Sequence, residues 1–322
     1  MSIPASILRA LHAVEPDETY SSAGGSRITS SKGVSYFAKT GSSGDWDQWN
    51  GEAKSLKAMY AAAPGLCPKF IAFGDDPPGS KRPYMISEYM DISGLTSTSG
   101  RRLAQRLALE LHEPTNSQQE VKGQFGFSCP TYCGVTRLEN GWFQTWEECF
   151  TALMKGLVAG IRQRGSGFAE TIRLGDETIE KVIPHLLSPS RLKDVQPVIL
   201  HGDLWSGNVG TLASGDPGGH VSSPFARLDL TPQRITVIYD PSSYYGHNEA
   251  DLAIARMFGG FPSDFWSEYH KHRPKTAPED EYDERQVLYE LFHYLNHTLI
   301  FGGGYASASV SRMKRLLRFV QR

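Results

Sequence analysis

Residues 198–208 read Val-Ile-Leu-His-Gly-Asp-Leu-Trp-Ser-Gly-Asn, and this stretch decides the predicted fold. Three apolar residues run into a polar loop that holds Asp203 and, five residues later, Asn208. An apolar run before such a loop is typical of a buried strand that delivers the loop to a cleft. Phosphoryl transfer uses this pattern, because the Asp accepts the proton of an attacking hydroxyl and the Asn oxygen holds a metal ion at the nucleotide phosphates.

A second predicted strand supplies the further carboxylate that such a metal site requires. Residues 235–239 read Ile-Thr-Val-Ile-Tyr and are followed by Asp240. A strand with a capping Asp and a turn Asn is also common in α/β proteins that transfer no phosphoryl group. Asn208 and Asp240 together favour the kinase interpretation over that alternative.

Length, charge and cysteine content set the broad class. The chain has 322 residues, which predicts two domains or one two-lobed unit. Its 33 Lys and Arg residues nearly balance 35 Asp and Glu residues, so we expect no nucleic-acid or membrane partner. The four cysteines form no disulfide framework, and no segment has the roughly 18 apolar residues of a membrane span. A cytoplasmic enzyme is therefore expected.

A strand near the amino terminus carries a lysine suited to contact phosphates. The strand predicted over residues 34–40 alternates apolar and polar positions, so Lys39 projects from one face. A glycine pair, Gly24 and Gly25, precedes it and by itself predicts only a β-turn. Lys39 taken alone is equally consistent with a surface lysine on an edge strand.

The next helix favours the functional interpretation of that lysine. Over residues 45–61 apolar side chains recur at helical spacing, and Glu52 flanks their stripe. Glu52 lies 13 residues after Lys39. This arrangement fits the Lys–Glu ion pair that directs a kinase lysine to the nucleotide phosphates.

Two further strands, predicted over residues 70–74 and 84–90, complete this first lobe. The second continues into a polar connector, which suits a hinge whose backbone pairs with adenine. The residues expected to contact adenine there are Glu88, Tyr89 and Met90.

We place the boundary between the lobes near residue 92. Residues 1–92 are predicted to form an amino-terminal nucleotide-binding lobe with the hinge, and residues 93–322 a carboxy-terminal catalytic and substrate-binding lobe. The predicted fold class is α+β, a two-lobed protein kinase-like fold with a small antiparallel β-rich first lobe and a larger, mainly helical second lobe. Helices are predicted in the second lobe over residues 101–112, 151–164, 176–187, 248–258, 262–271, 285–301 and 309–321.

Three stretches of the second lobe are predicted to be irregular. Residues 125–127 and 142–146 are expected to form a loop region and a helix entry. Residues 210–232 are rich in Gly, Ser and Pro and predict a surface loop or a hairpin insertion.

Two further features favour structural roles. His293 and His297 have the i, i+4 spacing of zinc ligands, but no Glu stands between them as in a zinc protease, so histidines of the core or of a cleft wall are favoured. Asp251 follows Asp240 by 11 residues near a predicted helix start. A helix-terminal or loop-bracing carboxylate is favoured there over a catalytic group.

Four stretches resemble the fructosamine/ketosamine 3-kinases of the protein-ribulosamine 3-kinase type, relatives of the aminoglycoside phosphotransferases and choline kinases. Residues 201–208 match the family's catalytic loop, in which Leu-Trp-Ser-Gly is the more particular part. Residues 239–247 read Tyr-Asp-Pro-Ser-Ser-Tyr-Tyr-Gly-His, close to the family's Tyr-Asp-Pro-Ala-Ser-Phe-Tyr-Gly-His. Residues 257–262 and 294–297, Met-Phe-Gly-Gly-Phe-Pro and Tyr-Leu-Asn-His, are the other two matches.

The resemblance implies a role for each matching residue. Asp203 would be the general base, and Asn208 and Asp240 would hold Mg²⁺. ATP would be bound by the glycine turn, the ion pair and the hinge, namely Gly24, Gly25, Lys39, Glu52, Glu88, Tyr89 and Met90. A sugar-amine pocket would be formed by Trp205, Tyr245, His247 and His297.

The implied reaction is ATP-dependent phosphorylation of the C3 hydroxyl of a ribulosamine or fructosamine adduct on a protein lysine or small amine. In this family the 3-phosphate makes the adduct unstable, so the amine is released. Glycated proteins or small ketoamines are the implied partners, and a monomer or weak homodimer is expected. The alternatives are a small-molecule alcohol kinase of the aminoglycoside or choline type and a non-catalytic kinase-like binding protein.

The chain departs from the family at two places. Ser26 stands where many relatives carry Cys after the paired glycines, which bears on redox switching or a disulfide-linked dimer but not on catalysis. The insertion over residues 210–232 separates Asn208 from Asp240 by more than is usual in the family.

Overall fold

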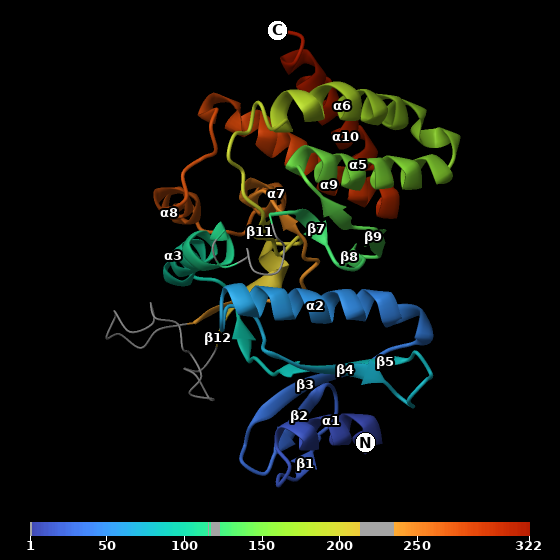
Figure 1. The fold of residues 1–322 in the computed structure, drawn as a ribbon, viewed down its shortest axis with the longest axis vertical. Coiled ribbons are helices and arrows are strands. Elements are labelled where there is room, and N and C mark those ends of the chain that lie inside the picture. The colour runs from blue at the N-terminus through green and yellow to red at the C-terminus, as the bar shows by residue number, and fades with distance from the viewer. Residues whose placement is uncertain (1, 115, 117–122, 213–234) are drawn as a thin grey trace.

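The amino-terminal lobe is an antiparallel sheet with a helix on each face (Figure 1). The computed structural model describes residues 2–114, 116, 123–212 and 235–322. The sheet order is β1-β2-β3-β5-β4. The elements are α1 (Ala5–Val14), β1 (Tyr20–Ser21), β2 (Arg27–Ser30), β3 (Ser35–Thr40), α2 (Trp46–Ala62), β4 (Phe70–Asp75) and β5 (Pro83–Glu88).

Side-chain alternation along β3 decides which residues reach the catalytic cleft. Tyr36 and Ala38 are buried in a small apolar cluster that also contains Ile7 and Leu11 of α1. Successive side chains of a strand point to opposite faces, so Lys39 faces the other side of the sheet, where α2 lies. Because β3 pairs with both β2 and β5, the lysine stands on an interior strand and not on an edge.

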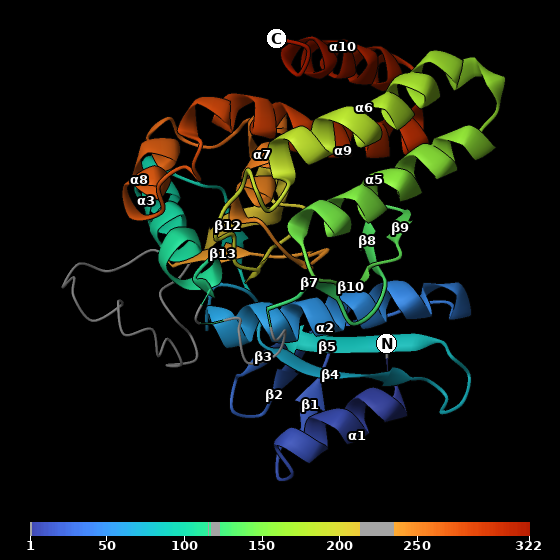
Figure 2. The ribbon, with the colours of Figure 1, turned by 45° about the horizontal axis from the view of Figure 1, so that its top comes forward.

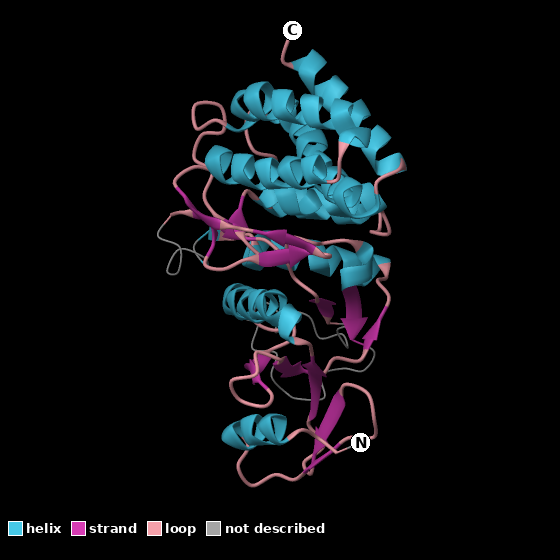
Figure 3. Cartoon of the chain, turned by 90° about the vertical axis from the view of Figure 1, so that its right-hand side faces the viewer, coloured by secondary structure: helices cyan, strands magenta, loops and turns pink. Residues whose placement is uncertain are grey.

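The carboxy-terminal lobe is mainly helical, and its long helices pack at the end of the molecule farthest from the small sheet (Figures 1 and 3). They are α5 (Trp146–Gln163), α6 (Ala169–Leu187), α9 (Tyr282–Phe301) and α10 (Gly304–Phe319). A second pair, α3 (Ser97–Arg106) and α8 (Asp264–His272), packs side by side (Figure 2). Among the helices that the structure describes, none is long and apolar enough to cross a membrane.

Short sheets between the helical bundle and the small lobe carry the loop of residues 200–208. On its amino-terminal side lie β11 (Val198–Ile199), β14 (Tyr245–Gly246), β7 (Phe125–Phe127) and β10 (Gly141–Phe143). On its carboxy-terminal side lie β12 (Val209–Leu212), β13 (Thr236–Ile238) and β6 (Ile92–Ser93). The hairpin β8 (Thr131–Cys133) and β9 (Thr136–Leu138) is separate.

The connection between the lobes is itself part of the second lobe's sheet. Ile92 and Ser93 pair with Leu212 and Thr211 of β12. The hinge is therefore anchored next to the strand that leaves the catalytic loop. The boundary near residue 92 stays a prediction.

Several predicted elements of the second lobe were wrong in kind or extent. Residues 125–127 and 141–143 are paired strands and not a loop region, because β7 also pairs with β14, which is distant in sequence. Residues 210–212 belong to β12 and not to an insertion, whereas the rest of the stretch predicted as an insertion, 213–232, lies outside the described residues.

Five helices begin earlier than predicted, namely α3, α5, α6, α9 and α10, and in two of them a cap explains the difference. Thr145 accepts a hydrogen bond from the backbone of Glu148, so α5 begins at Trp146. Thr96 and Ser99 cap α3 in the same way. Helix α6 begins at Ala169 and continues through Gly175, which lies against Val158 of α5.

A buried ion pair joins α7 (Asn248–Phe258) to α9 and places α7 under the catalytic loop. The Arg285 guanidinium donates to the Glu249 carboxylate at 2.7 and 3.1 Å, and both side chains are fully buried. The backbone N–H of Thr276 also donates to Glu249, at 2.7 Å. Removing one partner of such a pair leaves an uncompensated buried charge.

Glu249→Gln should therefore lower the free energy of unfolding by about 3–5 kcal/mol, since Arg285 keeps its charge. Urea unfolding followed by circular dichroism measures the loss. The matched control is Asp176→Asn, which breaks the exposed Arg162–Asp176 pair and should cost less than about 1 kcal/mol. Equal losses in the two variants would contradict this assignment.

Candidate active site

A buried carboxylate, Asp251 of α7, fixes the start of the catalytic loop. Its two oxygens accept the backbone N–H groups of His201 at 2.7 Å and Gly202 at 2.8 Å. His112 contacts the same carboxylate through Nε2 at 3.2 Å. Burial raises the pKa of Asp251, but hydrogen bonds and nearby histidines outweigh it and hold that pKa below its usual value. The favoured bracing role of Asp251 is confirmed.

The loop backbone turns sharply at Gly202, and only glycine fits there. Its φ is +80°, and a Cβ at this position would stand 2.0 Å from the carbonyl oxygen of Ser242. His201 next to it is fully buried, and its Nε2 lies 2.9 Å from the carbonyl oxygen of Tyr239. The turn thus presents Asp203 while His201 ties the loop to the strand that leads to Asp240.

Asp203 and Asn208 face each other across the loop. The Asn208 amide nitrogen donates to the Asp203 carbonyl oxygen at 3.0 Å and to its carboxylate Oδ2 at 3.2 Å. Burial raises the pKa of Asp203 to about 6, the Asn208 hydrogen bond opposes the rise, and the charges of Asp251 and Asp240 add to it. A carboxylate whose pKa lies close to neutral is a more effective proton acceptor than a solvated one.

Asp240 stands beside this pair in an uncommon backbone conformation. Its φ is +55°, in the left-handed region that side-chain-bearing residues seldom adopt. The backbone N–H of Tyr239 donates to the Asn208 carbonyl oxygen at 3.0 Å, which joins the end of β13 to the end of the catalytic loop. The backbone segments that carry Asn208 and Asp240 are thereby brought side by side.

The donor set fits a divalent cation shared with nucleotide phosphates. Mg²⁺ prefers oxygen ligands and usually binds through one or two carboxylates together with substrate phosphates. Asn208 and Asp240 supply such oxygens, and the neighbouring carboxylates concentrate negative charge there. Within the described part of the chain, no group of three or more His, Cys, Asp or Glu residues could hold a metal alone.

The predicted ion pair between the sheet and α2 is formed. Lys39 Nζ lies 2.8 and 2.6 Å from the two carboxylate oxygens of Glu52, and 5.0 Å from the centre of the Trp49 ring. Burial raises the pKa of Glu52, Lys39 opposes the rise, and the charge of Asp240 adds to it. Asp240 is therefore within electrostatic reach of both the ion pair and the catalytic loop.

The hinge and the glycine turn are the two remaining parts of the predicted nucleotide site. The backbone N–H groups of Glu88 and Tyr89 already donate to Lys69 and Ser35. Among the residues that the structure describes, the N–H of Met90 has no protein acceptor, so it is the hinge donor best placed for adenine. Gly24 and Gly25 form the turn between β1 and β2, both with positive φ.

Two of the four predicted sugar-pocket residues, Trp205 and His297, are linked through ring contacts. Trp205 is 39% exposed on the catalytic loop, and its ring passes over Gly207, where a Cβ would stand 2.2 Å from it. Its centroid lies 5.9 Å from that of Phe258, which in turn lies 5.4 Å from the ring of His297. Trp205 and His297 thus belong to one aromatic group.

Tyr245 and His247, the other two residues of the predicted pocket, are largely buried, and their part in a sugar pocket stays a prediction. Tyr245 is 3% exposed and packs against the rings of Phe127 and Trp142. His247 is 1% exposed, and its two ring nitrogens contact the hydroxyls of Tyr289 and Thr276, each at 2.8 Å. Tyr245 of β14 also lines a cavity of about 310 Å³ together with Phe127 and Trp142, whereas His247, at the start of α7, is held by its two hydroxyl partners.

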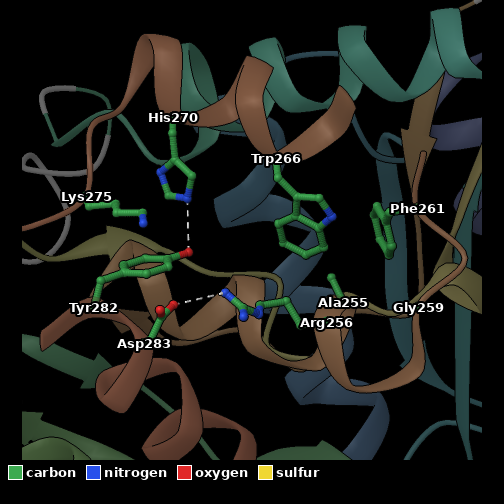
Figure 4. Close-up of a pocket in the computed structure, with 9 residues that line it drawn as sticks. All are labelled: Ala255, Arg256, Gly259, Phe261, Trp266, His270, Lys275, Tyr282 and Asp283. Atoms are coloured by element: carbon green, nitrogen blue, oxygen red, sulfur yellow. Dashed lines mark hydrogen bonds and ion pairs between the residues drawn. The ribbon is translucent and has the colours of Figure 1, made fainter. Parts of the chain in front are cut away.

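A separate cavity of about 450 Å³ opens beside the segment that follows α7 (Figure 4). Tyr282 contacts His270 within it, its hydroxyl lying 3.0 Å from His270 Nε2, and Arg256 lies 3.9 Å from Asp283. Phe258, whose ring contacts Trp205, is not part of its lining. The lining residues are Ala255, Arg256, Gly259, Phe261, Trp266, His270, Lys275, Tyr282 and Asp283.

Comparison with known proteins finds relatives over most of the chain. A model of the fructosamine kinase family matches residues 14–319. Ketosamine-3-kinase of Mus musculus is 33% identical over 285 residues, which cover 83% of this chain and 83% of that protein. Chloroplastic protein-ribulosamine 3-kinase of Arabidopsis thaliana is 32% identical over 290 residues, covering 89% of this chain and 77% of the plant protein.

A solved structure shows the same architecture at low sequence identity. A thermostable mutant of aminoglycoside phosphotransferase APH(4)-Ia, in a ternary complex with AMP-PNP and hygromycin B, has a TM-score of 0.55 at 14% identity. The superposition covers 98% of each chain. Fold and site together define a kinase-like phosphotransferase that uses a nucleotide and acts on a hydroxyl group. More narrowly, the chain belongs to the fructosamine kinase family.

The sequence reasoning missed the aromatic residues around Trp205. Phe258 and Phe301 are 41% and 65% exposed, and both contact His297. A signal was present, since His297 and Phe301 have the i, i+4 spacing of one helix face. It was overlooked because only the histidine spacing was considered.

Asp251→Asn should reduce kcat about 100-fold, because one carboxylate acceptor becomes an NH₂ group that cannot accept from a loop N–H. The KM for ATP should change little, since Lys39 and Glu52 are in the other lobe. Steady-state kinetics measures both values. Asp176→Asn on the exposed surface is the control, and an unchanged kcat in Asp251→Asn would contradict the bracing role.

Proposed function

We propose that this protein transfers the γ-phosphoryl group of ATP to the C3 hydroxyl of a ketosamine, the adduct of a sugar such as ribose or glucose with an amine. The observation that carries the proposal is the loop that places Asp203 opposite Asn208 and next to the exposed indole of Trp205. Family membership supports the acceptor class, and two relatives have names that refer to ketosamines and ribulosamines.

Residues of the small lobe would bind the nucleotide. Lys39, oriented by Glu52, would contact the phosphates, and the turn at Gly24 and Gly25 would approach them with its backbone. The backbone N–H of Met90 would donate to the adenine edge. Bound in this way, the nucleotide would direct its γ-phosphate toward the catalytic loop.

Residues of the catalytic loop would act on the acceptor. Trp205 presents an exposed indole face on which the apolar side of a sugar can lie. Asp203 would accept the proton of the C3 hydroxyl while the hydroxyl oxygen attacks the γ-phosphorus. The Asn208 amide holds the Asp203 carboxylate in place. Position and charge supply most of the catalysis in this type of reaction.

Asn208 and Asp240 are the residues that would hold Mg²⁺. When bound, the ion neutralises phosphate charge and helps to hold the phosphates for in-line transfer. Asn208 ends the catalytic loop, and Asp240 follows β13. Because the backbone hydrogen bond of Tyr239 joins these two segments, the fold of the chain sets how close the two residues lie.

Release of the amine would follow from the position of the phosphate. A phosphate on C3 lies next to the C2 carbonyl of the ketoamine and is a far better leaving group than a hydroxyl. Loss of a proton from C1 would give the 1,2-enol, which would expel inorganic phosphate from C3 and leave the amine bound to C1 as an imine. Water would then hydrolyse the imine to the free amine and a 3-deoxy dicarbonyl sugar. The acceptors of such an enzyme are glycated proteins or small ketoamines.

The direct test is ATP turnover with a panel of ribulosamine and fructosamine adducts of lysine. The wild-type protein should transfer phosphate to at least one of them. Asp203→Asn should lower kcat/KM by about 10²–10⁴-fold, since it removes the proton acceptor but keeps the shape. Asp176→Asn should behave like the wild type. No transfer to any ketoamine, or full activity in Asp203→Asn, would overturn the proposal.

Asp240→Asn tests the proposed metal ligand separately. Loss of the carboxylate should raise the Mg²⁺ concentration for half-maximal activity at least tenfold, because the remaining neutral oxygen binds a hard cation less strongly. Titration of activity with MgCl₂ at saturating ATP measures the shift. An unchanged Mg²⁺ requirement would remove Asp240 from the metal site.

A further inference from the structure

Five ring-bearing side chains form a continuous group that begins on the catalytic loop, here named the aromatic stripe. From Trp205 the ring contacts pass through Phe258 at 5.9 Å and His297 at 5.4 Å. From His297 they reach Phe301 at 5.7 Å and Tyr305 at 4.9 Å. The stripe consists of Trp205, Phe258, His297, Phe301 and Tyr305, contributed by the catalytic loop, α7, α9 and α10.

The stripe is exposed to an extent that internal packing does not explain. Trp205 is 39%, Phe258 41% and Phe301 65% exposed, and they are among the few large apolar side chains so exposed in the described part of the chain. Internal packing covers only part of each ring, least of all at Phe301, so apolar carbon stays in contact with water. Contiguous exposed apolar surface of this kind marks a binding surface.

The composition of the stripe limits what it can recognise. None of its five residues is a carboxylate, so it is a poor match for a polycationic acceptor such as an aminoglycoside. The Nδ1 atom of His297 lies 2.7 Å from the carbonyl oxygen of His293, which holds this ring in a fixed orientation between its aromatic neighbours. A surface of fixed rings suits aliphatic or aromatic carbon.

We infer that the aromatic stripe binds the carrier of the ketosamine, the part beyond the modified nitrogen, and selects carriers with apolar surface. This inference rests on the proposed function, because it takes the sugar to lie on Trp205. It specifies the acceptor as a glycated lysine with an apolar residue next to it in the chain.

The length of the lysine side chain indicates which part of the carrier would contact each ring of the aromatic stripe. An extended lysine stem spans roughly 7 Å from the sugar carbon to Cα, given bonds of about 1.5 Å. This is more than the 5.9 Å step from Trp205 to Phe258. The stem therefore crosses Phe258, and the residue adjacent to the modified lysine reaches Phe301 and Tyr305.

The test compares acceptors that share the sugar but differ in carrier. The probes are the fructosamine of methylamine and two glycated peptides in which Leu or Ser follows the modified lysine. The wild-type protein should prefer the Leu peptide to the Ser peptide in kcat/KM. In Phe301→Ser the ratio of kcat/KM for the Leu peptide to that for methylamine fructosamine should fall about tenfold.

Phe258→Ser should lower kcat/KM on both peptides, because the lysine stem is common to them. The matched control is Val14→Ser, which removes a 52%-exposed apolar side chain at the end of α1 in the other lobe and should change no ratio. Thermal unfolding of each variant checks that it is folded.

Two outcomes would overturn the inference. Equal activity of the wild type on the Leu and Ser peptides would show that the stripe selects no apolar carrier. A Phe301→Ser variant with an unaltered ratio would show that the far end of the stripe contacts no carrier. Either result, obtained with a wild-type protein that phosphorylates methylamine fructosamine, leaves the proposed function intact. Absence of transfer to every ketosamine would overturn the proposed function first.

Discussion

The catalytic loop depends on one interaction, the acceptance of two consecutive backbone N–H groups by the buried carboxylate of Asp251. These donors precede Asp203 directly, so the position of the proton acceptor follows from the position of α7. Helix α7 is held in turn by the buried pair of Glu249 with Arg285 of α9. The buried negative charge of Asp251 is tolerated because each of its carboxylate oxygens has a hydrogen-bond partner.

A second consequence of this arrangement is electrostatic. Burial is the largest cause of the raised pKa of both Asp203 and Glu52, and the charge of Asp240 adds to the rise in each. Lys39 is the cation that faces this group from the small lobe. The excess of carboxylate explains why the site suits a cation and phosphates together, and why the two lobes must meet at this point for transfer.

Local patterns in the sequence were sufficient for the parts of the site that lie on one loop or on two elements close together in the chain. The loop spacing predicted that Asp203 and Asn208 would meet, and the helical position of Glu52 predicted its contact with Lys39; both contacts are present. Side-chain direction was not predictable for Tyr245, because pairing of β14 with distant strands turns it inward. The aromatic stripe also escaped notice, since α7, α9 and α10 bring its rings together only in three dimensions.

In the proposed reaction, the loop directs phosphate to one hydroxyl of a sugar bound beside Trp205. The most direct measurement is the position of the phosphate in the product formed from ATP and a fructosamine, determined by ³¹P and ¹³C NMR. The account predicts phosphorus on the C3 oxygen, followed by release of the amine. Phosphate on another hydroxyl, or ATP hydrolysis without transfer, would contradict it.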